Sequence, residues 1–132
     1  MSLTLPVTAV YVSLLAVLVV ILALLVVRLR RGLKVGIGDG GNRDLARAIR
    51  VHGNAIESIP LFLVLLAVYE INGGNMTLLH IFGGVFFIAR VLHARGMLAT
   101  VGASRGRVFG TIGTNTCLLG LAIANVLRLF GA

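Results

Sequence analysis

The sequence has very few acidic residues, one cysteine and no tryptophan. Aspartate and glutamate together number 4 against 12 lysines and arginines, and charged residues make up only 12% of the chain. A soluble domain has roughly 25% charged residues, so a chain that is 58% hydrophobic has too few of them to cover its apolar surface. The single cysteine, Cys117, excludes an intrachain disulfide and a cysteine-only metal site. The shortage of charge therefore indicates a membrane protein.

The excess of basic over acidic residues would suggest a nucleic-acid partner if the protein were soluble. Aromatic residues are only 6% of the chain, and no nucleic-acid-binding motif is present. A membrane origin of the basic excess is therefore favoured, and no nucleic-acid partner is expected. The three histidines, at positions 52, 80 and 93, include no i, i+4 pair, so no metal site is expected either.

Four apolar segments predict membrane-spanning helices. Residues 5–27 carry no charge, and about 20 helical residues span a hydrocarbon core of ~30 Å. Arginines follow this segment instead of preceding it, so it is not a cleavable signal peptide. The other predicted helices cover residues 44–69, 76–92 and 108–130. We therefore expect residues 1–132 to form a single domain, an all-α integral membrane protein folded as a four-transmembrane-helix bundle.

The positions of the basic residues predict the orientation of these helices. Eleven of the 12 lie in or beside the segments 28–43 and 93–107, and only Arg128 lies toward the opposite side. Because cytoplasmic loops are enriched in lysine and arginine, we expect both basic loops in the cytoplasm and both termini on the other side of the inner membrane.

A polar stripe runs along the first half of the second predicted helix. At 100° per residue, Arg47, Arg50, Asn54 and Glu57 fall within about 80° of one another. Such groups at membrane depth must pair, line a wet cavity or bind a ligand. One interpretation is an internal Arg50–Glu57 pair bridged by Asn54. The other is a site for a zwitterionic ligand that carries both carboxylates and an ammonium group.

Two segments resemble a known family. The first is Arg47-Ala-Ile-Arg-Val-His-Gly-Asn-Ala-Ile-Glu-Ser-Ile-Pro-Leu-Phe62, and the second is Phe87-Ile-Ala-Arg-Val-Leu-His-Ala-Arg-Gly96. Both resemble the MAPEG superfamily, the membrane-associated proteins of eicosanoid and glutathione metabolism, and in particular its bacterial branch. The resemblance implies a homotrimer with glutathione bound between neighbouring protomers near the cytoplasmic face.

The resemblance also implies roles for particular residues. Arg50, Asn54 and Glu57 would hold the polar groups of glutathione, and His52 would reach the ligand of the adjacent protomer. The resemblance further implies that Arg30, in the first loop, contacts glutathione. An arginine near the start of the fourth helix would stabilise the thiolate; we expect this to be Arg105, with Arg107 as the alternative. Three positions that are tyrosines in the leukotriene-forming enzyme are Ser58, His93 and Met97 here. Of these replacements, His93 could still donate a hydrogen bond.

Three functions compete on this basis. The first is a glutathione S-transferase or glutathione-dependent peroxidase that acts on lipophilic electrophiles, with glutathione as co-substrate and a hydrophobic small molecule as substrate. The second is a non-catalytic lipid-binding or scaffold member of the same fold. The third is a small multidrug exporter, which would need a carboxylate in the first helix, where this chain has none. Expected partners are a second and third copy of the chain and the surrounding lipids.

Overall fold

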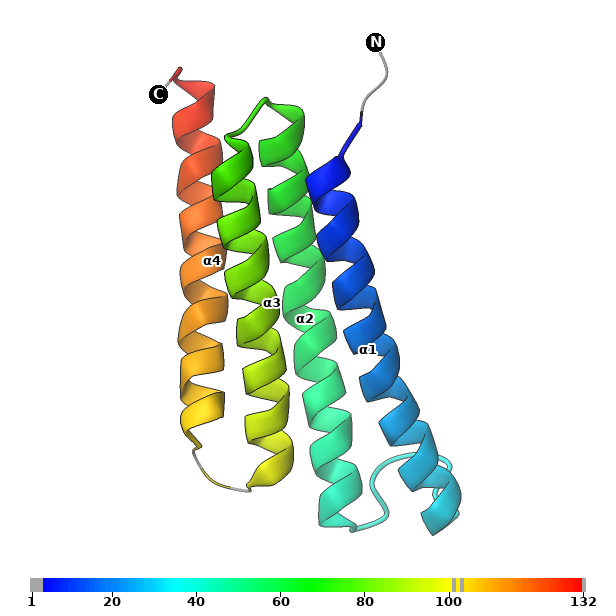
Figure 1. The fold of residues 1–132 in the computed structure, drawn as a ribbon. Helices are drawn as coiled ribbons and strands as arrows, with labels where there is room; N and C mark the ends of the chain where they lie inside the picture. The colour runs from blue at the N-terminus through cyan, green and yellow to red at the C-terminus, as the bar shows by residue number, and fades with distance from the viewer. Residues whose placement is uncertain (1–3, 101, 103, 132) are drawn as a thin grey trace.

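Four long helices form the whole fold in the computed structural model, which describes residues 4–100, 102 and 104–131. They are α1 (Pro6–Leu33), α2 (Arg43–Ile71), α3 (Met76–Ala99) and α4 (Arg105–Leu129). All four are long and apolar enough to cross a membrane. Figure 1 shows them side by side, with the start of α1 and the end of α4 at the same end of the bundle. The predicted all-α arrangement of four apolar helices is thus confirmed.

The helices continue further into the basic segments than the apolar runs alone predicted. The first helix does not stop at Val27 but includes Arg28, Arg30 and Arg31 and ends at Leu33, after which Lys34 caps it with a left-handed φ of 55°. The third helix likewise continues past Leu92 to Ala99. Arginine is a good helix former, so the chain stays helical after it has left the hydrocarbon. The basic residues therefore lie mostly on rigid helix ends.

The α2 and α3 helices are the central pair of the bundle. Each contacts the other and both outer helices, whereas α1 and α4 do not meet within the described parts of the chain. The rings of Phe62 on α2 and Phe86 on α3 stack with centroids 3.7 Å apart, and both side chains are fully buried. Polar side chains near this seam are consequently enclosed by helices from both sides.

Glycines allow α3 and α4 to approach closely near the basic end. A Cβ added at Gly110 would lie 2.5 Å from the Cβ of His93 and 2.6 Å from the carbonyl oxygen of Ala89, and one added at Gly106 would lie 2.9 Å from the Leu92 carbonyl oxygen. Small residues let helix backbones come together in a membrane, where packing drives association. The position of α4 against α3 therefore depends on these glycines.

Polar contacts tie the helices together at the end that carries the termini. The Glu70 carboxylate at the end of α2 accepts hydrogen bonds from the backbone N–H groups of Val7 (2.9 Å) and Thr8 (2.7 Å). These N–H groups are in the first turn of α1 and have no partner within their own helix. Tyr11 donates to the backbone carbonyl of His80 at 3.0 Å. A carboxylate at a helix N-terminus also interacts favourably with the helix dipole, so Glu70 fixes α1 to α2.

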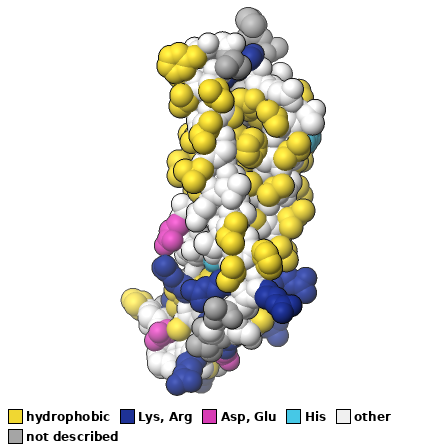
Figure 2. Space-filling view, turned by 90° about the vertical axis from the view of Figure 1, so that its left-hand side faces the viewer, with side chains coloured by type: hydrophobic (Ala, Val, Ile, Leu, Met, Phe, Trp, Pro, Cys, Tyr) yellow, Lys and Arg dark blue, Asp and Glu magenta, His cyan; other side chains and the backbone are white. Residues whose placement is uncertain are grey.

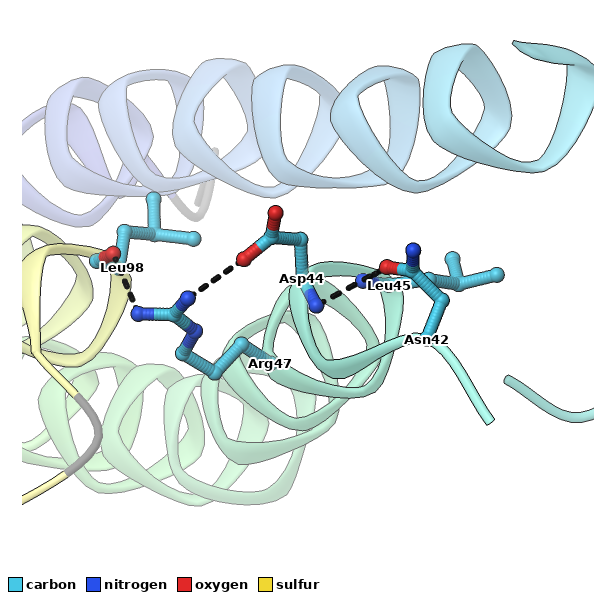
Figure 3. A network of polar contacts seen from close by, with 5 residues as sticks. All are labelled: Asn42, Asp44, Leu45, Arg47 and Leu98. Atoms are coloured by element: carbon cyan, nitrogen blue, oxygen red, sulfur yellow. Dashed lines mark hydrogen bonds and ion pairs between the residues drawn. The ribbon is translucent and has the colours of Figure 1, made fainter. Parts of the chain in front are cut away.

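The opposite end of the bundle carries the basic residues. Figure 2 shows most of the lysine and arginine side chains of the visible face gathered at this end, whereas hydrophobic side chains are spread over the rest of that face. Figure 3 shows Arg47 of α2, which donates to the Leu98 carbonyl oxygen of α3 at 3.3 Å and pairs with Asp44. The Asn42 side chain accepts from the N–H groups of Asp44 and Leu45 and so caps α2. Arg47 is therefore used within the fold to connect two helices.

Candidate functional site

A pocket of about 210 Å³ opens between α2, α3 and α4. Eight of its ten lining residues are polar or charged, which is unusual at membrane depth, where such groups tend to be functional. The lining residues are Asn54, Glu57, Ser58, Leu61, Arg90, His93, Thr111, Thr114, Asn115 and Leu118. Of the seven residues that the sequence predicts for a binding site, this pocket brings together Asn54, Glu57 and His93.

Arg90 of α3 is the buried cation of this pocket. Its side chain is only 2% exposed, yet neither of the two ion pairs found among the described residues involves it. Its Nη2 donates to Asn54 Oδ1 at 2.8 Å and its Nη1 to Thr114 Oγ1 at 3.4 Å, while Nε has no partner. An enclosed guanidinium held by neutral groups alone retains the capacity to bind an anion.

His93 lies one turn after Arg90 and faces the same pocket. Its side chain is 5% exposed, and its Nδ1 is buried without a hydrogen-bond partner. The close approach of Gly110 to the His93 backbone and Cβ holds this part of α3 against α4. The pocket thus contains two buried nitrogen-bearing side chains whose hydrogen-bonding capacity is only partly used.

The Arg50–Glu57 pair exists, but it is not internal. Arg50 Nη1 lies 3.6 Å from Glu57 Oε1, and the two side chains are 66% and 58% exposed. Asn54 does not bridge the pair, because its side-chain oxygen accepts from Arg90 instead. The interpretation of the stripe as a closed pair bridged by Asn54 is therefore wrong on both points. An exposed pair of this kind contributes little to stability, so Glu57 remains available to a ligand.

The other predicted residues lie outside the pocket in the single chain. Arg30 donates through Nη1 to the carbonyl oxygens of Gly36 (3.1 Å) and Gly38 (2.8 Å) and so organises the first basic loop. Arg105 is exposed and lines a separate hollow at the start of α4, together with Val108 and Phe109. His52 is half-buried and does not line the pocket.

Sequence reasoning missed Arg90 as a member of the site. It counted this arginine among the basic residues of the cytoplasmic end, although Arg90 is the one charged residue in the predicted span 76–92. A charged residue inside an apolar span is by default a functional candidate, and that signal was sufficient to find it. The polar α4 residues of the pocket (Thr111, Thr114, Asn115) gave only a weak signal, since small polar residues also serve helix contacts.

The arrangement combines charges of both signs over a short distance. The buried guanidinium of Arg90 suits a carboxylate, the exposed carboxylate of Glu57 suits an ammonium group, and Asn54 and Ser58 add neutral hydrogen-bonding groups. Within the described part of the chain, no three His, Cys, Asp or Glu side chains are grouped so that they could hold a metal ion. The pocket is therefore suited to a small zwitterionic molecule.

Comparison with known proteins agrees with the resemblance of the two segments. The sequence model of the MAPEG family matches residues 8–127. The chain is also 39% identical over 120 residues to the inner membrane protein YecN of Escherichia coli strain K12, an alignment that covers 91% of this chain and 90% of that protein. The YecN protein of Escherichia coli O6:H1 matches to the same extent. The similarity thus extends over nearly the whole of both chains.

Proposed function

The chain belongs to the MAPEG family, and on that premise we propose that it is a glutathione-binding membrane protein that acts as a glutathione S-transferase or glutathione-dependent peroxidase. Its substrates in this proposal are lipophilic electrophiles dissolved in the bilayer. It is homologous to an inner membrane protein and has four candidate membrane-spanning helices, so such substrates would reach it from the lipid phase.

The observation that carries this proposal is the buried guanidinium of Arg90 beside the exposed carboxylate of Glu57. Glutathione has two carboxylates and one ammonium group, so it presents charges complementary to both side chains. In this proposal Arg90 and Arg50 bind carboxylates, Glu57 binds the γ-glutamyl ammonium, and Asn54 and His93 donate or accept neutral hydrogen bonds.

The pocket volume of about 210 Å³ is below the roughly 300–1,000 Å³ typical of small-molecule sites, which supports the proposed homotrimer, in which a neighbouring protomer completes the site. In the proposed trimer, His52 contacts the ligand of the adjacent protomer, and Arg30 contacts glutathione from the first loop. Both residues lie outside the pocket of their own chain, and Arg30 lies at the basic end of the bundle. The proposed ligand therefore binds at a subunit boundary.

The proposed chemistry depends on a thiolate. A free thiol has a pKa of about 8.5, and a nearby arginine lowers it, so more of the nucleophile is present at neutral pH. We assign this role to Arg105. In the transferase reaction the thiolate sulfur forms a bond to the electrophilic carbon, and the leaving group departs with the electron pair of the bond that breaks. In the peroxidase reaction two glutathione molecules are oxidised to the disulfide while a hydroperoxide is reduced to an alcohol and water.

Calorimetric titration of the purified protein with glutathione tests the proposal. We expect saturable binding, and we expect Glu57→Ala to weaken it by about tenfold or more, because a hydrogen bond to a charged group is lost, without dissociating the oligomer. Asp44→Asn is the matched control, since Asp44 is an exposed carboxylate on the same helix that pairs with Arg47 away from the pocket. Absence of binding at millimolar glutathione would overturn the proposal.

The replacement of three family tyrosines favours a second candidate function. Ser58, His93 and Met97 occupy positions that are tyrosines in the leukotriene-forming enzyme, so the phenol groups are missing there, and of the three replacements only Ser58 keeps a hydroxyl, on a shorter side chain. A non-catalytic member that binds lipid or serves as a scaffold would fit this pattern. Such a protein would not conjugate glutathione to chlorodinitrobenzene, a chromogenic electrophile, whereas a transferase would.

A further inference from the structure

The connection between α1 and α2, residues 34–42, folds back along the helix ends. Arg30, which lies within the last turn of α1, holds the carbonyl oxygens of Gly36 and Gly38. The loop also borders Arg50 on α2, because Gly38 and Arg50 line one shared hollow. Figure 1 shows the loop turning back from the end of α1 toward the middle of the bundle before it enters α2.

The loop has a defined conformation. Glycines at positions 38, 40 and 41 have positive φ values, which favour glycine. The Asp39 side chain accepts from the Gly41 N–H at 2.9 Å, and the Asp39 carbonyl accepts from the Asn42 N–H at 2.9 Å. This conformation leaves Ile37 94% exposed. The exposure of Ile37 is thus a consequence of the way in which the loop is built.

The depth of the loop places Ile37 near the boundary between hydrocarbon and headgroups. Val27 is the last residue of the uncharged run of α1, and it lines one hollow of about 430 Å³ together with Arg31, Lys34 and Gly36. At 1.5 Å per residue α1 is about 42 Å long, longer than a hydrocarbon core of ~30 Å. The loop therefore returns to the level at which α1 leaves the hydrocarbon, where apolar side chains insert.

The surroundings of Ile37 are strongly basic. Residues 28–43 include five basic residues and one acidic residue. Arg28, Arg31, Lys34 and Arg43 are exposed, and the two ion pairs among the described residues involve none of them. Basic residues beside a membrane attract anionic lipids.

We propose that this loop is a binding surface for anionic phospholipid. Ile37 inserts among the acyl chains just below the headgroups, and the lipid phosphodiester lies against the side chains of Arg31 and Lys34, which border the shallow hollow beside Gly36. The net positive charge of the loop complements an anionic lipid and not the equally basic loop of another copy of the chain. Free phosphate would satisfy the cations but leave Ile37 in water. The cations of this surface, Arg31 and Lys34, are not among the residues proposed to bind glutathione, so a failure of the lipid test can be distinguished from a failure of glutathione binding.

A fluorescent label at position 37 tests the proposal in the full-length protein. The native cysteine is first replaced (Cys117→Ala), and an environment-sensitive dye is attached to the cysteine of the Ile37→Cys variant. The labelled protein is placed in vesicles of phosphatidylcholine alone and in vesicles with an equal part of phosphatidylglycerol. When phosphatidylglycerol is present, we expect the emission of the dye to shift to the blue. We also expect aqueous acrylamide to quench the dye less than in pure phosphatidylcholine, by about half or more. Gly102→Cys is the matched control, because this exposed position in the other basic loop has open space around it; its label should stay quenchable in both vesicles.

The two parts of the surface can be separated by further variants. Arg31→Gln combined with Lys34→Gln should abolish the difference between the two vesicles. Equal quenching of the label at position 37 in both vesicles would overturn the proposal, as would protection of the label in lipid-free detergent, which would show that a second copy covers Ile37. Loss of the blue shift on addition of soluble glycerophosphate would also overturn it, because the cations would then bind the phosphate group without the lipid.

Discussion

Arg90 on α3 donates a hydrogen bond of 2.8 Å to the side-chain oxygen of Asn54 on α2. This contact joins a buried cation to the polar stripe that the sequence places on a single helix, and it turns Asn54 away from the Arg50–Glu57 pair. Because Arg90 has only neutral partners among the described residues, the contact also leaves a positive charge that a ligand could neutralise.

The Asn54–Arg90 contact should show coupled effects on stability. We expect Asn54→Leu to lower the free energy of unfolding by about 1–3 kcal/mol, because it deprives a buried guanidinium of an acceptor. The double variant Asn54→Leu with Arg90→Met should recover most of this loss, since replacing both partners by apolar groups removes the unsatisfied group. Thermal unfolding of the two single variants and the double variant in detergent measures the coupling. Additive losses would contradict it.

Glu70 should stabilise the first turn of α1. We expect Glu70→Ala to lower the free energy of unfolding by about 2 kcal/mol, because two backbone N–H groups lose a charged acceptor. Hydrogen exchange at Val7 and Thr8 should become faster. Glu57→Ala is the control for stability, since its half-exposed ion pair should contribute at most about 1 kcal/mol. Unchanged exchange at both positions would show that water replaces the carboxylate without cost.

The close contact of α3 and α4 should not tolerate a methyl group. A Cβ at position 110 would meet the backbone and Cβ of His93, so we expect Gly110→Ala to destabilise the bundle by about 1–3 kcal/mol through overpacking. Gly32→Ala is the matched control, because nothing lies within 4 Å of a Cβ there and alanine is the better helix former by up to about 1 kcal/mol. In thermal unfolding, Gly110→Ala should lower the melting temperature and Gly32→Ala should raise it. A higher melting temperature for Gly110→Ala would contradict the packing of α3 against α4 described above.

The arginine that activates the thiol should be identifiable from the ultraviolet absorbance of bound glutathione thiolate. If the proposed function holds, Arg105→Gln should remove most of this absorbance at neutral pH and move the thiol titration toward a free thiol pKa of about 8.5. Arg107→Gln should leave the titration in place. The reverse result would transfer the role to Arg107, and no change in either variant would show that neither arginine faces the sulfur.

Much of the fold could be predicted from local properties of the sequence. The length of the uncharged run before Arg28, the short interval between the predicted helices 44–69 and 76–92, and the basic segments were sufficient to predict four membrane helices, because helix formation and hydrophobic length depend on neighbouring residues. The resemblance of residues 47–62 to the MAPEG family is confirmed by the family match and by YecN. The helix ends were less predictable, since α1 and α3 remain helical through arginines outside the apolar runs.

The site itself was only half predictable. Asn54 and Glu57 could be grouped by helical periodicity, since both belong to α2, and the resemblance supplied His93. The partnership of Asn54 with Arg90 could not be predicted, nor could the exposure of the Arg50–Glu57 pair.

The sequence by itself determined that this chain is a membrane bundle with a polar stripe on its second helix. Only the tertiary structure decided that Arg90 meets Asn54, that Glu70 caps α1, and that the Ile37 loop folds back along the helix ends. The reason is that each of these contacts depends on the rotation of a helix about its axis and on its shift along that axis. Both are set by the packing of side chains that are far apart in the chain, such as Phe62 against Phe86, and not by the periodicity of any one helix.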